Sequence, residues 1–222
     1  MGKIFLVPVG EQMKPLYEGF RYVKNIEQVY LICSDYTRKM AKEMKDKLSA
    51  VYKIEVIETK AERIDDIIDD IITAIKDFKN KRIISNISGG TKIMSLACYI
   101  ISSYTEGFSF YIFKDEKSEM KYVEVPSLKI NIDLFVKNNS KKFKLLEKLS
   151  KKDYFLNQLS KELNIKSSTT NAHIYTLERT GMVKTERMGR KLIIKITTTG
   201  KLIYSLVKLK HRMGVENDKN LR

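Results

Sequence analysis

The sequence predicts two domains: an α/β domain with a mostly parallel sheet, and a smaller domain of short helices with one β-hairpin. Two observations predict this division. Up to Val125, short apolar runs alternate with segments of helical periodicity, which is typical of a doubly wound parallel sheet. Beyond Val125 this alternation ends, and short amphipathic segments separated by turn residues replace it.

The first domain is expected to follow a Rossmann-like order of elements, because each apolar run leads into an amphipathic segment. Apolar residues recur every three or four positions in these segments, as they do on the buried face of a helix. The expected strands are residues 3–9, 28–33, 53–57, 82–87 and 108–113, with an edge strand at 121–125, and the expected helices are residues 36–51, 62–79 and 91–104.

A polar loop through Asn138, Asn139 and Ser140 separates the two domains and is expected to end in a helix cap. We therefore expect a first domain at residues 1–137, a second domain at 138–213 and a disordered tail at 214–222. Within the second domain the pattern predicts helices at 142–150, 155–163, 168–180 and 199–211, a turn through Asn164, and a hairpin at 183–196.

Positive charge is concentrated in the second domain. Residues 1–137 carry 22 basic and 20 acidic side chains, a net charge of +2, whereas residues 138–222 carry 20 basic and 7 acidic side chains, a net charge of +13. A general lysine bias would affect both parts equally. The asymmetry therefore indicates a module that binds a polyanion, joined to one that is nearly neutral.

The composition excludes several protein classes. With 43% hydrophobic residues the chain is globular rather than disordered. Its longest apolar stretch, residues 93–101, is shorter than the roughly 20 residues that cross a bilayer. The amino terminus lacks the apolar core of a secretory signal, so we expect a cytoplasmic protein with no membrane partner. Cys33 and Cys98 lie in apolar runs and are expected to be core residues.

The spacing of apolar residues from Leu156 to Gly181 is that of two short helices joined by a tight turn. Ser167 or Ser168 can cap the second helix, whose apolar face carries Ile174 and Leu177. Short polar side chains near the start of such a helix let its backbone approach base edges in the major groove of DNA. We expect Ser167, Ser168, Thr170, Asn171 and Tyr175 to face DNA.

After Gly181 the sequence alternates into a two-stranded wing with Met188, Gly189 and Arg190 at its tip. The expected phosphate or minor-groove contacts of this wing are Arg187, Arg190 and Lys191. Together, residues 159–200 resemble the winged helix-turn-helix repressors of the ArsR and MarR kind. That resemblance implies binding to double-stranded promoter DNA. A winged helix that only dimerises is the alternative, and the net charge of +13 favours DNA binding.

His173 lies, according to this resemblance, near the DNA backbone. With no partner in the sequence it is expected to be packed, and neither His173 nor His211 has a cysteine nearby, so no metal site is expected. Ala172 departs from the long polar residue often found there, which shifts base recognition to Asn171 and Tyr175. The final helix has an apolar stripe through Leu206, which is expected to pack on its own domain or on that of a second copy.

One sharp motif in the first domain, N-I-S-G-G-T-K, lies where the fourth strand ends and a helix begins. Consecutive glycines let backbone amides approach a ligand, and the start of the helix adds free N–H groups and a positive dipole end. The motif is neither a Walker A loop nor a dinucleotide fingerprint. A simple tight turn is the alternative to an anion site. The predicted ligand contacts are Asn86, Ser88, Gly89, Gly90, Thr91 and Lys92.

A strand, this motif and a helix within a small α/β domain, followed by a winged helix, resemble the CARF (CRISPR-associated Rossmann fold) family, and more narrowly its winged-helix transcription regulators. The resemblance implies a homodimer in antiviral defence that binds a cyclic oligoadenylate, cyclic tetra-adenylate above all, with no other cofactor. It adds a second wall made of Gly10, Glu11 and Gln12 after the first strand, and Ser34 after the second. Glu11 departs from what the resemblance implies for this wall, because a carboxylate near phosphates is unfavourable unless it points to ribose hydroxyls or away from the ligand.

Other activities remain open at the level of the sequence. Some relatives in this family cut their own cyclic ligand, and Lys92 with Ser88 would supply that slow ring-nuclease activity here. A repressor that senses another phosphorylated metabolite through the same loop is the third interpretation. A ribonuclease of the HEPN kind needs an arginine, a spacer of four to six residues and then a histidine. Neither His173 nor His211 has an arginine at that spacing before it. The D-D-x-x-D pattern from Asp65 to Asp69 is expected to be the solvated face of a helix.

Overall fold

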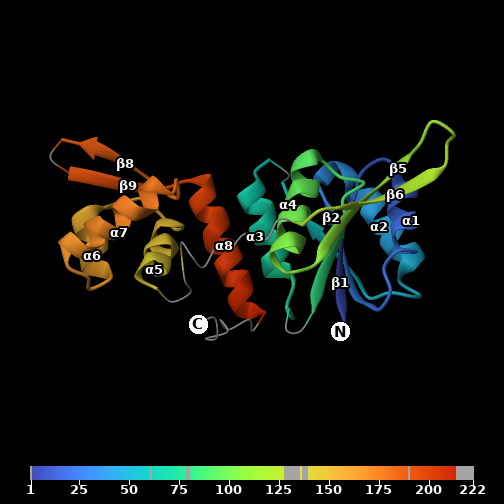
Figure 1. The fold of residues 1–222 in the computed structure, drawn as a ribbon, viewed down its shortest axis with the longest axis horizontal. Helices are drawn as coiled ribbons and strands as arrows, with labels where there is room; N and C mark the ends of the chain where they lie inside the picture. The colour runs from blue at the N-terminus through green and yellow to red at the C-terminus, as the bar shows by residue number, and fades with distance from the viewer. Residues whose placement is uncertain are drawn as a thin grey trace. The chain divides into compact units, whose positions relative to one another are not determined.

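The computed structural model describes residues 2–60, 62–78, 81–127, 136, 140–189 and 191–213. The chain divides into two compact units: Met1–Ile130 with Arg212–Arg222, and Asn131–His211. Figure 1 shows the elements of both units. The boundary predicted after residue 137 and the tail predicted at 214–222 both lie outside the described residues.

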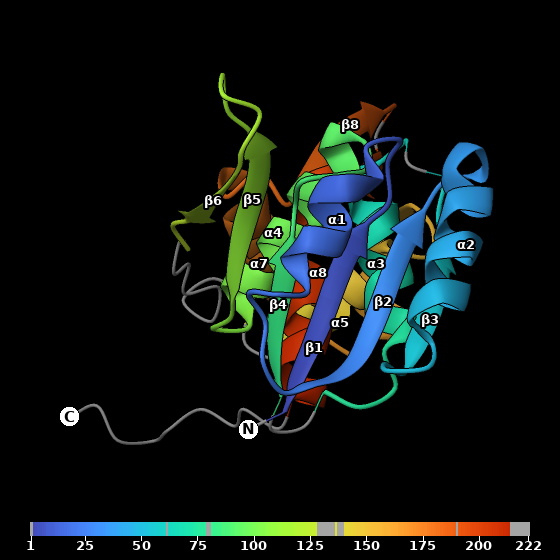
Figure 2. The same cartoon turned by 90° about the vertical axis from the view of Figure 1, so that its right-hand side faces the viewer.

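The first unit is built on a six-stranded sheet of the order β3-β2-β1-β4-β5-β6. All neighbouring pairs are parallel except β5 and β6, which form an antiparallel hairpin. Figure 2 shows β2, β1 and β4 running side by side. Both the Rossmann-like parallel sheet and the edge strand are confirmed. The strands are β1 (Lys3–Pro8), β2 (Ile26–Cys33), β3 (Ile54–Glu58), β4 (Arg82–Asn86), β5 (Phe108–Lys114) and β6 (Met120–Val125).

Helices cover both faces of this sheet, α1 and α2 on one and α3 and α4 on the other (Figure 1). The helix α1 was not expected from the sequence, because it has only seven residues, with Pro15 in its first turn. The helix α3 ends earlier than its periodicity predicts, because Ile75 has an extended conformation while still burying its side chain. The helices are α1 (Met13–Gly19), α2 (Arg38–Leu48), α3 (Ile64–Ala74) and α4 (Lys92–Tyr104), with a 3-10 turn η1 (Asp35–Thr37) before α2.

The core of the first unit lies between the sheet and its helices. Phe5, Leu31 and Phe110 are fully buried there, and the ring centroids of Phe5 and Phe110 lie 6.0 Å apart. Cys33 and Cys98 are buried free thiols, as expected. Burial raises the pKa of the Cys33 thiol to about 11, so this group stays protonated near neutral pH. The cysteines therefore act as small packing residues.

The second unit has the order of elements expected of a winged helix-turn-helix. Its three-stranded sheet, β7-β9-β8, includes a strand that the sequence analysis did not predict, in which Tyr154 and Phe155 pair with Ile194 and Ile193. The helix expected from Phe155 therefore begins one residue later, at Leu156. Ser140 caps α5 as expected, since its side chain accepts a hydrogen bond from the Phe143 N–H. The elements are α5 (Lys141–Leu149), β7 (Tyr154–Phe155), α6 (Leu156–Glu162), α7 (Ser167–Arg179), β8 (Val183–Met188), β9 (Lys191–Ile196) and α8 (Thr198–Arg212).

Every helix in the described part of the chain is too short or too polar to cross a membrane.

Candidate anion site and nucleic-acid interface

The strand order of the first unit reverses between β1 and β4, with β2 and β3 on one side and β5 and β6 on the other. In open α/β sheets such a reversal creates a crevice at the carboxyl ends of the strands, where ligands bind. The loop of Gly10 to Gln12 follows β1, and the loop of Ile87 to Thr91 follows β4. The topology therefore brings both predicted ligand loops to one crevice.

Three glycines let these two loops approach each other more closely than larger residues allow. A Cβ atom on Gly10 would lie 2.6 Å from the Gly90 nitrogen. A Cβ atom on Gly90 would lie 2.7 Å from the Pro8 Cβ, and its φ of +74° disfavours any L side chain. Gly89 is equally confined, because its Cβ would meet Leu16 at 2.7 Å. The loop after β1, which was expected as a second wall, thus lies directly against Gly89 and Gly90, and we call these two loops the glycine cradle.

The helix α4 starts directly at the glycine cradle. Thr91 is its N-cap and accepts a hydrogen bond from the Met94 N–H at 3.2 Å. The first helical amides, those of Lys92 and Ile93, have no carbonyl partner within the helix and form the positive end of its dipole. The Lys92 side chain is exposed beside them. Ser95 fixes the loop by donating a hydrogen bond to the Gly89 carbonyl at 2.7 Å. This arrangement suits an anion such as phosphate.

Two residues of the motif have a different role from the one predicted. Asn86 is fully buried, so it positions the loop instead of facing a ligand. Its amide nitrogen donates to the Pro15 carbonyl at 3.1 Å, and its oxygen accepts from the Ser88 N–H at 3.1 Å and from the Ser88 hydroxyl. The Ser88 hydroxyl also accepts a hydrogen bond from the Ile112 N–H at 2.7 Å. Because that hydroxyl already has a donor and an acceptor partner, it is committed to the fold rather than to a phosphate.

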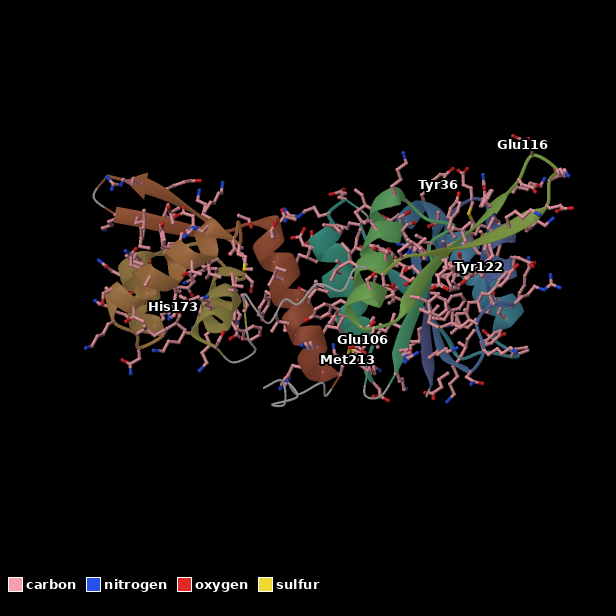
Figure 3. The ribbon with its side chains drawn as sticks, in the orientation of Figure 1. Tyr36, Glu106, Glu116, Tyr122, His173 and Met213 are labelled. Carbon is pink, nitrogen blue, oxygen red and sulfur yellow. The ribbon has the colours of Figure 1, made fainter. Side chains whose placement is uncertain are left out.

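The remaining wall residues lie after β1 and β2. The Glu11 carboxylate accepts a hydrogen bond of 2.8 Å from the Tyr36 hydroxyl, which raises the pKa of Tyr36. The Glu11 carboxylate therefore faces the Tyr36 hydroxyl. This orientation removes the objection that a carboxylate beside the phosphates of a ligand would be unfavourable. Ser34 is the N-cap of η1, and Gln12 is an exposed residue at the start of α1. Tyr36, with 75% of its surface exposed, was missed by the sequence analysis, because a lone tyrosine after a strand has no distinguishing pattern (Figure 3).

A cavity of about 500 Å³ adjoins the glycine cradle on the side of α4, β5 and β6. None of the four residues predicted as the second wall lines this cavity. Its lining combines the loop after β4 with one face of α4 and the adjacent hairpin. The lining residues are Ile87, Ser88, Gly89, Gly90, Lys92, Ser95, Leu96, Tyr99, Tyr111 and Val125.

The second unit presents a helix-turn-helix made of α6 and α7. Asn164 makes the predicted tight turn with a φ of +50°, in the left-handed region that asparagine tolerates. Two predictions about α7 are wrong. The cap is not Ser167 or Ser168, because Lys166 precedes the first helical residue without a side-chain cap. Thr170 does not face outward, because it is fully buried and its hydroxyl donates to the Lys166 carbonyl at 3.2 Å.

The other predicted DNA contacts of α7 and the wing are exposed. On α7 these are Ser167, Ser168, Asn171 and Tyr175, and the guanidinium of Arg179 lies 5.9 Å from the centre of the Tyr175 ring. In the wing Arg187 and Lys191 flank the tip, where Gly189 has a φ of +61°. Arg190 lies outside the described residues. These exposed polar and basic groups suit contacts with base edges and phosphates.

A carboxylate that the sequence analysis missed connects α7 to the wing. Glu178 of α7 accepts hydrogen bonds from the Thr185 N–H at 3.0 Å and from the Thr185 hydroxyl at 2.6 Å. Because Thr185 lies in β8, this pair fixes the wing relative to α7. The sequence alone offers no signal for a contact between an exposed glutamate and a threonine on another element.

His173, which is labelled in Figure 3, is half-buried on α7, in line with the packed position expected of it. Its Nε2 atom is buried without a hydrogen-bond partner, and burial, together with the charges of Lys142 and Lys141, lowers the pKa of the imidazole. Within the described residues no three His, Cys, Asp or Glu side chains gather as metal ligands do. In the D-D-x-x-D pattern, Asp65 is buried beside Arg63, at 2.7 Å, and not solvated as predicted.

Comparison with known proteins relates the chain to one family and to several structures. A family model described as “HFX_2341_N:-like, N-terminal” matches residues 3–118. An uncharacterized protein of Archaeoglobus fulgidus is 26% identical over 198 residues, which cover 82% of this chain and 87% of the relative.

Two solved structures are among those that the chain matches. Can2 from Sulfobacillus thermosulfidooxidans, solved in complex with cyclic tetra-adenylate, is 13% identical with a TM-score of 0.43 and covers 94% of this chain and 57% of its own. Reduced HlyU from Vibrio cholerae is 21% identical with a TM-score of 0.32 and covers 38% of this chain and 87% of its own. The architecture implied by the CARF resemblance, a Rossmann-like sheet followed by a winged helix, is present in the structure itself.

Proposed function

The chain belongs to the family described as “HFX_2341_N:-like, N-terminal”, and we propose that it is a DNA-binding transcriptional regulator that responds to a cyclic oligoadenylate. One observation carries this proposal. A single chain joins an anion cradle, in a part with a net charge of +2, to a winged helix in a part with a net charge of +13. The first part suits a small anionic signal, and the second suits a polyanion.

The geometry of the cradle supports a phosphate-bearing ligand. Gly10 and Gly90 bring two loops together at the start of α4, where helical amides and Lys92 offer positive charge. A cyclic oligoadenylate presents several phosphates and bases in one ring, and cyclic tetra-adenylate is the member that we propose. Another phosphorylated metabolite bound by the same loop is the principal alternative, and a ligand titration distinguishes the two.

We propose that the regulator acts as a homodimer in the cytoplasm. A two-fold dimer would present two α7 helices to two half-sites of a promoter, one helical turn apart. It would also bring two glycine cradles to one cyclic ligand. The signal would act through its differential affinity for two arrangements of the dimer.

We propose binding rather than cleavage of the ligand. A ring nuclease needs groups that stabilise charge at the cleaved phosphate. The Ser88 hydroxyl already has partners in Asn86 and Ile112, which leaves Lys92 without the proposed serine. Multiple-turnover cleavage of cyclic oligoadenylate, lost in Lys92→Ala, would contradict this proposal and make the protein an enzyme.

The test measures ligand binding and DNA binding in the same preparation. Cyclic tetra-adenylate is expected to raise the melting temperature of the protein and to change its affinity for duplex DNA from its own promoter by at least about fivefold. Lys92→Ala is expected to weaken ligand binding, whereas Lys53→Ala, which removes an exposed lysine before β3, is the matched control. A protein that binds the DNA but no cyclic oligoadenylate would overturn the proposed signal.

The DNA affinity is expected to fall steeply with salt, because each neutralised phosphate contributes a slope of about −0.9 to log K against log salt. Arg187→Ala is expected to reduce this slope by about 1. Lys53→Ala serves again as the control, because it lies in the near-neutral unit. A salt-independent affinity, or none, would contradict DNA binding by the wing.

A further inference from the structure

The exposed side of α7 carries a single lysine or arginine. Four exposed residues of this helix are spaced as i, i+3, i+4 and i+7, so they share one side of it. These residues are Ala172, Tyr175, Thr176 and Arg179. Arg179 is the only lysine or arginine in α7, although the surrounding unit is strongly basic. The fixed positive charge of this side therefore comes from one side chain.

The guanidinium of Arg179 is held beside the ring of Tyr175. Its Cζ atom lies 5.9 Å from the ring centre, which is within the range of about 6 Å for a cation–π contact. Side chains on a helix lean toward its amino terminus, so Arg179 covers the turn that carries Tyr175. The adjacent carboxylate of Glu178 is directed to the wing, where it accepts two hydrogen bonds from Thr185. Arg179 thus presents its guanidinium from a restrained position.

The other two residues on this side leave the guanidinium accessible. Ala172 has no polar side-chain group and is small. The Thr176 hydroxyl donates a hydrogen bond of 3.0 Å to the Ala172 carbonyl, so it is satisfied on the helix itself. A ligand that approaches this side of α7 therefore meets the guanidinium of Arg179 as its principal hydrogen-bond donor.

The chemistry of a guanidinium selects one base among four. The group has five N–H donors in a fixed fork and no acceptor. In the major groove guanine presents two neighbouring acceptors, N7 and O6, whereas adenine combines an acceptor with a donor, thymine has one acceptor and cytosine has a donor. A phosphate also accepts from a guanidinium, but that contact carries no sequence information. A restrained fork on the groove-facing side of a helix matches guanine best.

We propose that Arg179 reads a guanine in the major groove of the bound duplex, and that Tyr175 is the residue that positions it. The inference rests on the proposed function and deepens it, because it names a base that the regulator selects and the side chain that selects it. In this role the aromatic ring of Tyr175 acts through Arg179, and the hydroxyl of Tyr175 is not needed.

The experiment first determines the base preference of the full chain, by selecting bound duplexes from a random pool. Each preferred guanine is then replaced by adenine, and the affinity of the protein for both duplexes is measured. At the position read by Arg179 this replacement is expected to weaken binding at least about fivefold in the unchanged protein. Arg179→Ala is expected to bind these two duplexes within about twofold of each other, and to keep the preferences at the other positions.

Variants of Tyr175 test its positioning role. Tyr175→Phe keeps the ring and is expected to keep the preference for guanine, whereas Tyr175→Ala is expected to reduce it. The double variant of Tyr175→Ala and Arg179→Ala is expected to lose no more of the preference than Arg179→Ala alone, because both residues serve one contact. The matched control is Arg82→Ala, which removes an exposed arginine at the start of β4.

Three outcomes would overturn the inference. An equal loss of affinity for all duplexes in Arg179→Ala, with a salt slope reduced by about 1, would make Arg179 a phosphate contact. A lower melting temperature with an unchanged base preference would make it a residue that only stabilises the carboxyl end of α7. Both of these results would leave the proposed function intact. Failure of the unchanged protein to bind any duplex would overturn the proposed function and this inference with it.

Discussion

In the first unit the candidate site is built from backbone and buried groups, whereas in the second unit it is built from side chains that project into solvent. The glycine cradle depends on Gly10, Gly90 and the fully buried Asn86. The winged helix presents Asn171 and Tyr175 from the exposed surface of α7. The two units therefore differ in whether the residues that shape the site also hold the fold together.

This difference predicts how substitutions act. In the first unit a change at a glycine of the cradle or at Asn86 disturbs close packing or a buried hydrogen bond, so stability and binding are lost together, whereas the exposed Lys92 is the exception. In the second unit a changed contact residue leaves the fold intact, since exposed substitutions usually alter stability by less than about 0.5 kcal/mol. The two units are best compared by making the same substitution at one residue type in each, because the chemical change is then identical.

The largest effect is expected from Gly90→Ala, compared with Gly189→Ala. Both glycines have positive φ, +74° and +61°, so each substitution incurs the left-handed strain of about 1 kcal/mol. Only at Gly90 does the new Cβ meet Pro8, at 2.7 Å, while nothing lies within 4 Å at Gly189. Overpacking adds about 1–3 kcal/mol to the loss of stability.

Chemical denaturation of both variants measures this difference as the change in the free energy of unfolding. Gly90→Ala is also expected to abolish ligand binding, whereas Gly189→Ala is expected to keep it. Equal losses of stability would show that the contact with Pro8 relaxes at little cost, and would remove the steric basis of the cradle.

A second comparison uses Asn86→Ala and Asn171→Ala. Asn86→Ala removes the amide that donates to the Pro15 carbonyl and accepts from the Ser88 N–H in the interior. We therefore expect the free energy of unfolding to fall by about 2–4 kcal/mol. Asn171→Ala removes an exposed amide of α7, and its effect on stability is expected to stay within about 0.5 kcal/mol.

For DNA binding the order is reversed, and the larger effect is expected from Asn171→Ala. Asn171→Ala is expected to weaken DNA binding about tenfold, the loss of one good contact with a base edge. Its salt dependence should not change, because no phosphate contact is lost. A fully stable Asn86→Ala protein would contradict the positioning role that the structure gives to this residue.

The sequence predicts the elements of both units well because their periodicity is strong, but it does not determine which polar groups face a ligand. The close approach of the backbone at Gly89 and Gly90 was predictable, since consecutive glycines before a helix permit it, whereas Gly10 was expected only from the family resemblance. The burial of Asn86 was not predictable, because it depends on α1, a helix of seven residues that periodicity does not reveal. Thr170 was misjudged for a related reason, since a threonine can satisfy its hydroxyl on the helix itself and then be buried.

The smallest effect, and one confined to the second unit, is expected from pH. Both histidines of the chain, His173 and His211, lie in this unit. Burial and the charges of Lys142 and Lys141 hold the pKa of His173 below its unfolded value. The unfolded chain therefore binds a proton more readily than the folded one as the pH falls through the unfolded pKa, near 6.5. The free energy of unfolding therefore keeps the whole contribution of His173 above this pH. It decreases as the pH falls from the unfolded pKa to the folded pKa.

Urea denaturation at pH 7.5 and pH 5.5 tests this expectation. The midpoint is expected to fall slightly at the lower pH in the unchanged protein, and to fall less in His173→Gln, which has no titrating imidazole at that position. His211→Gln is the control, because its histidine is exposed on α8. An equal fall in His173→Gln and in the unchanged protein would assign the pH dependence to carboxylates. Since carboxylates occur in both units, that result would remove this distinction between them.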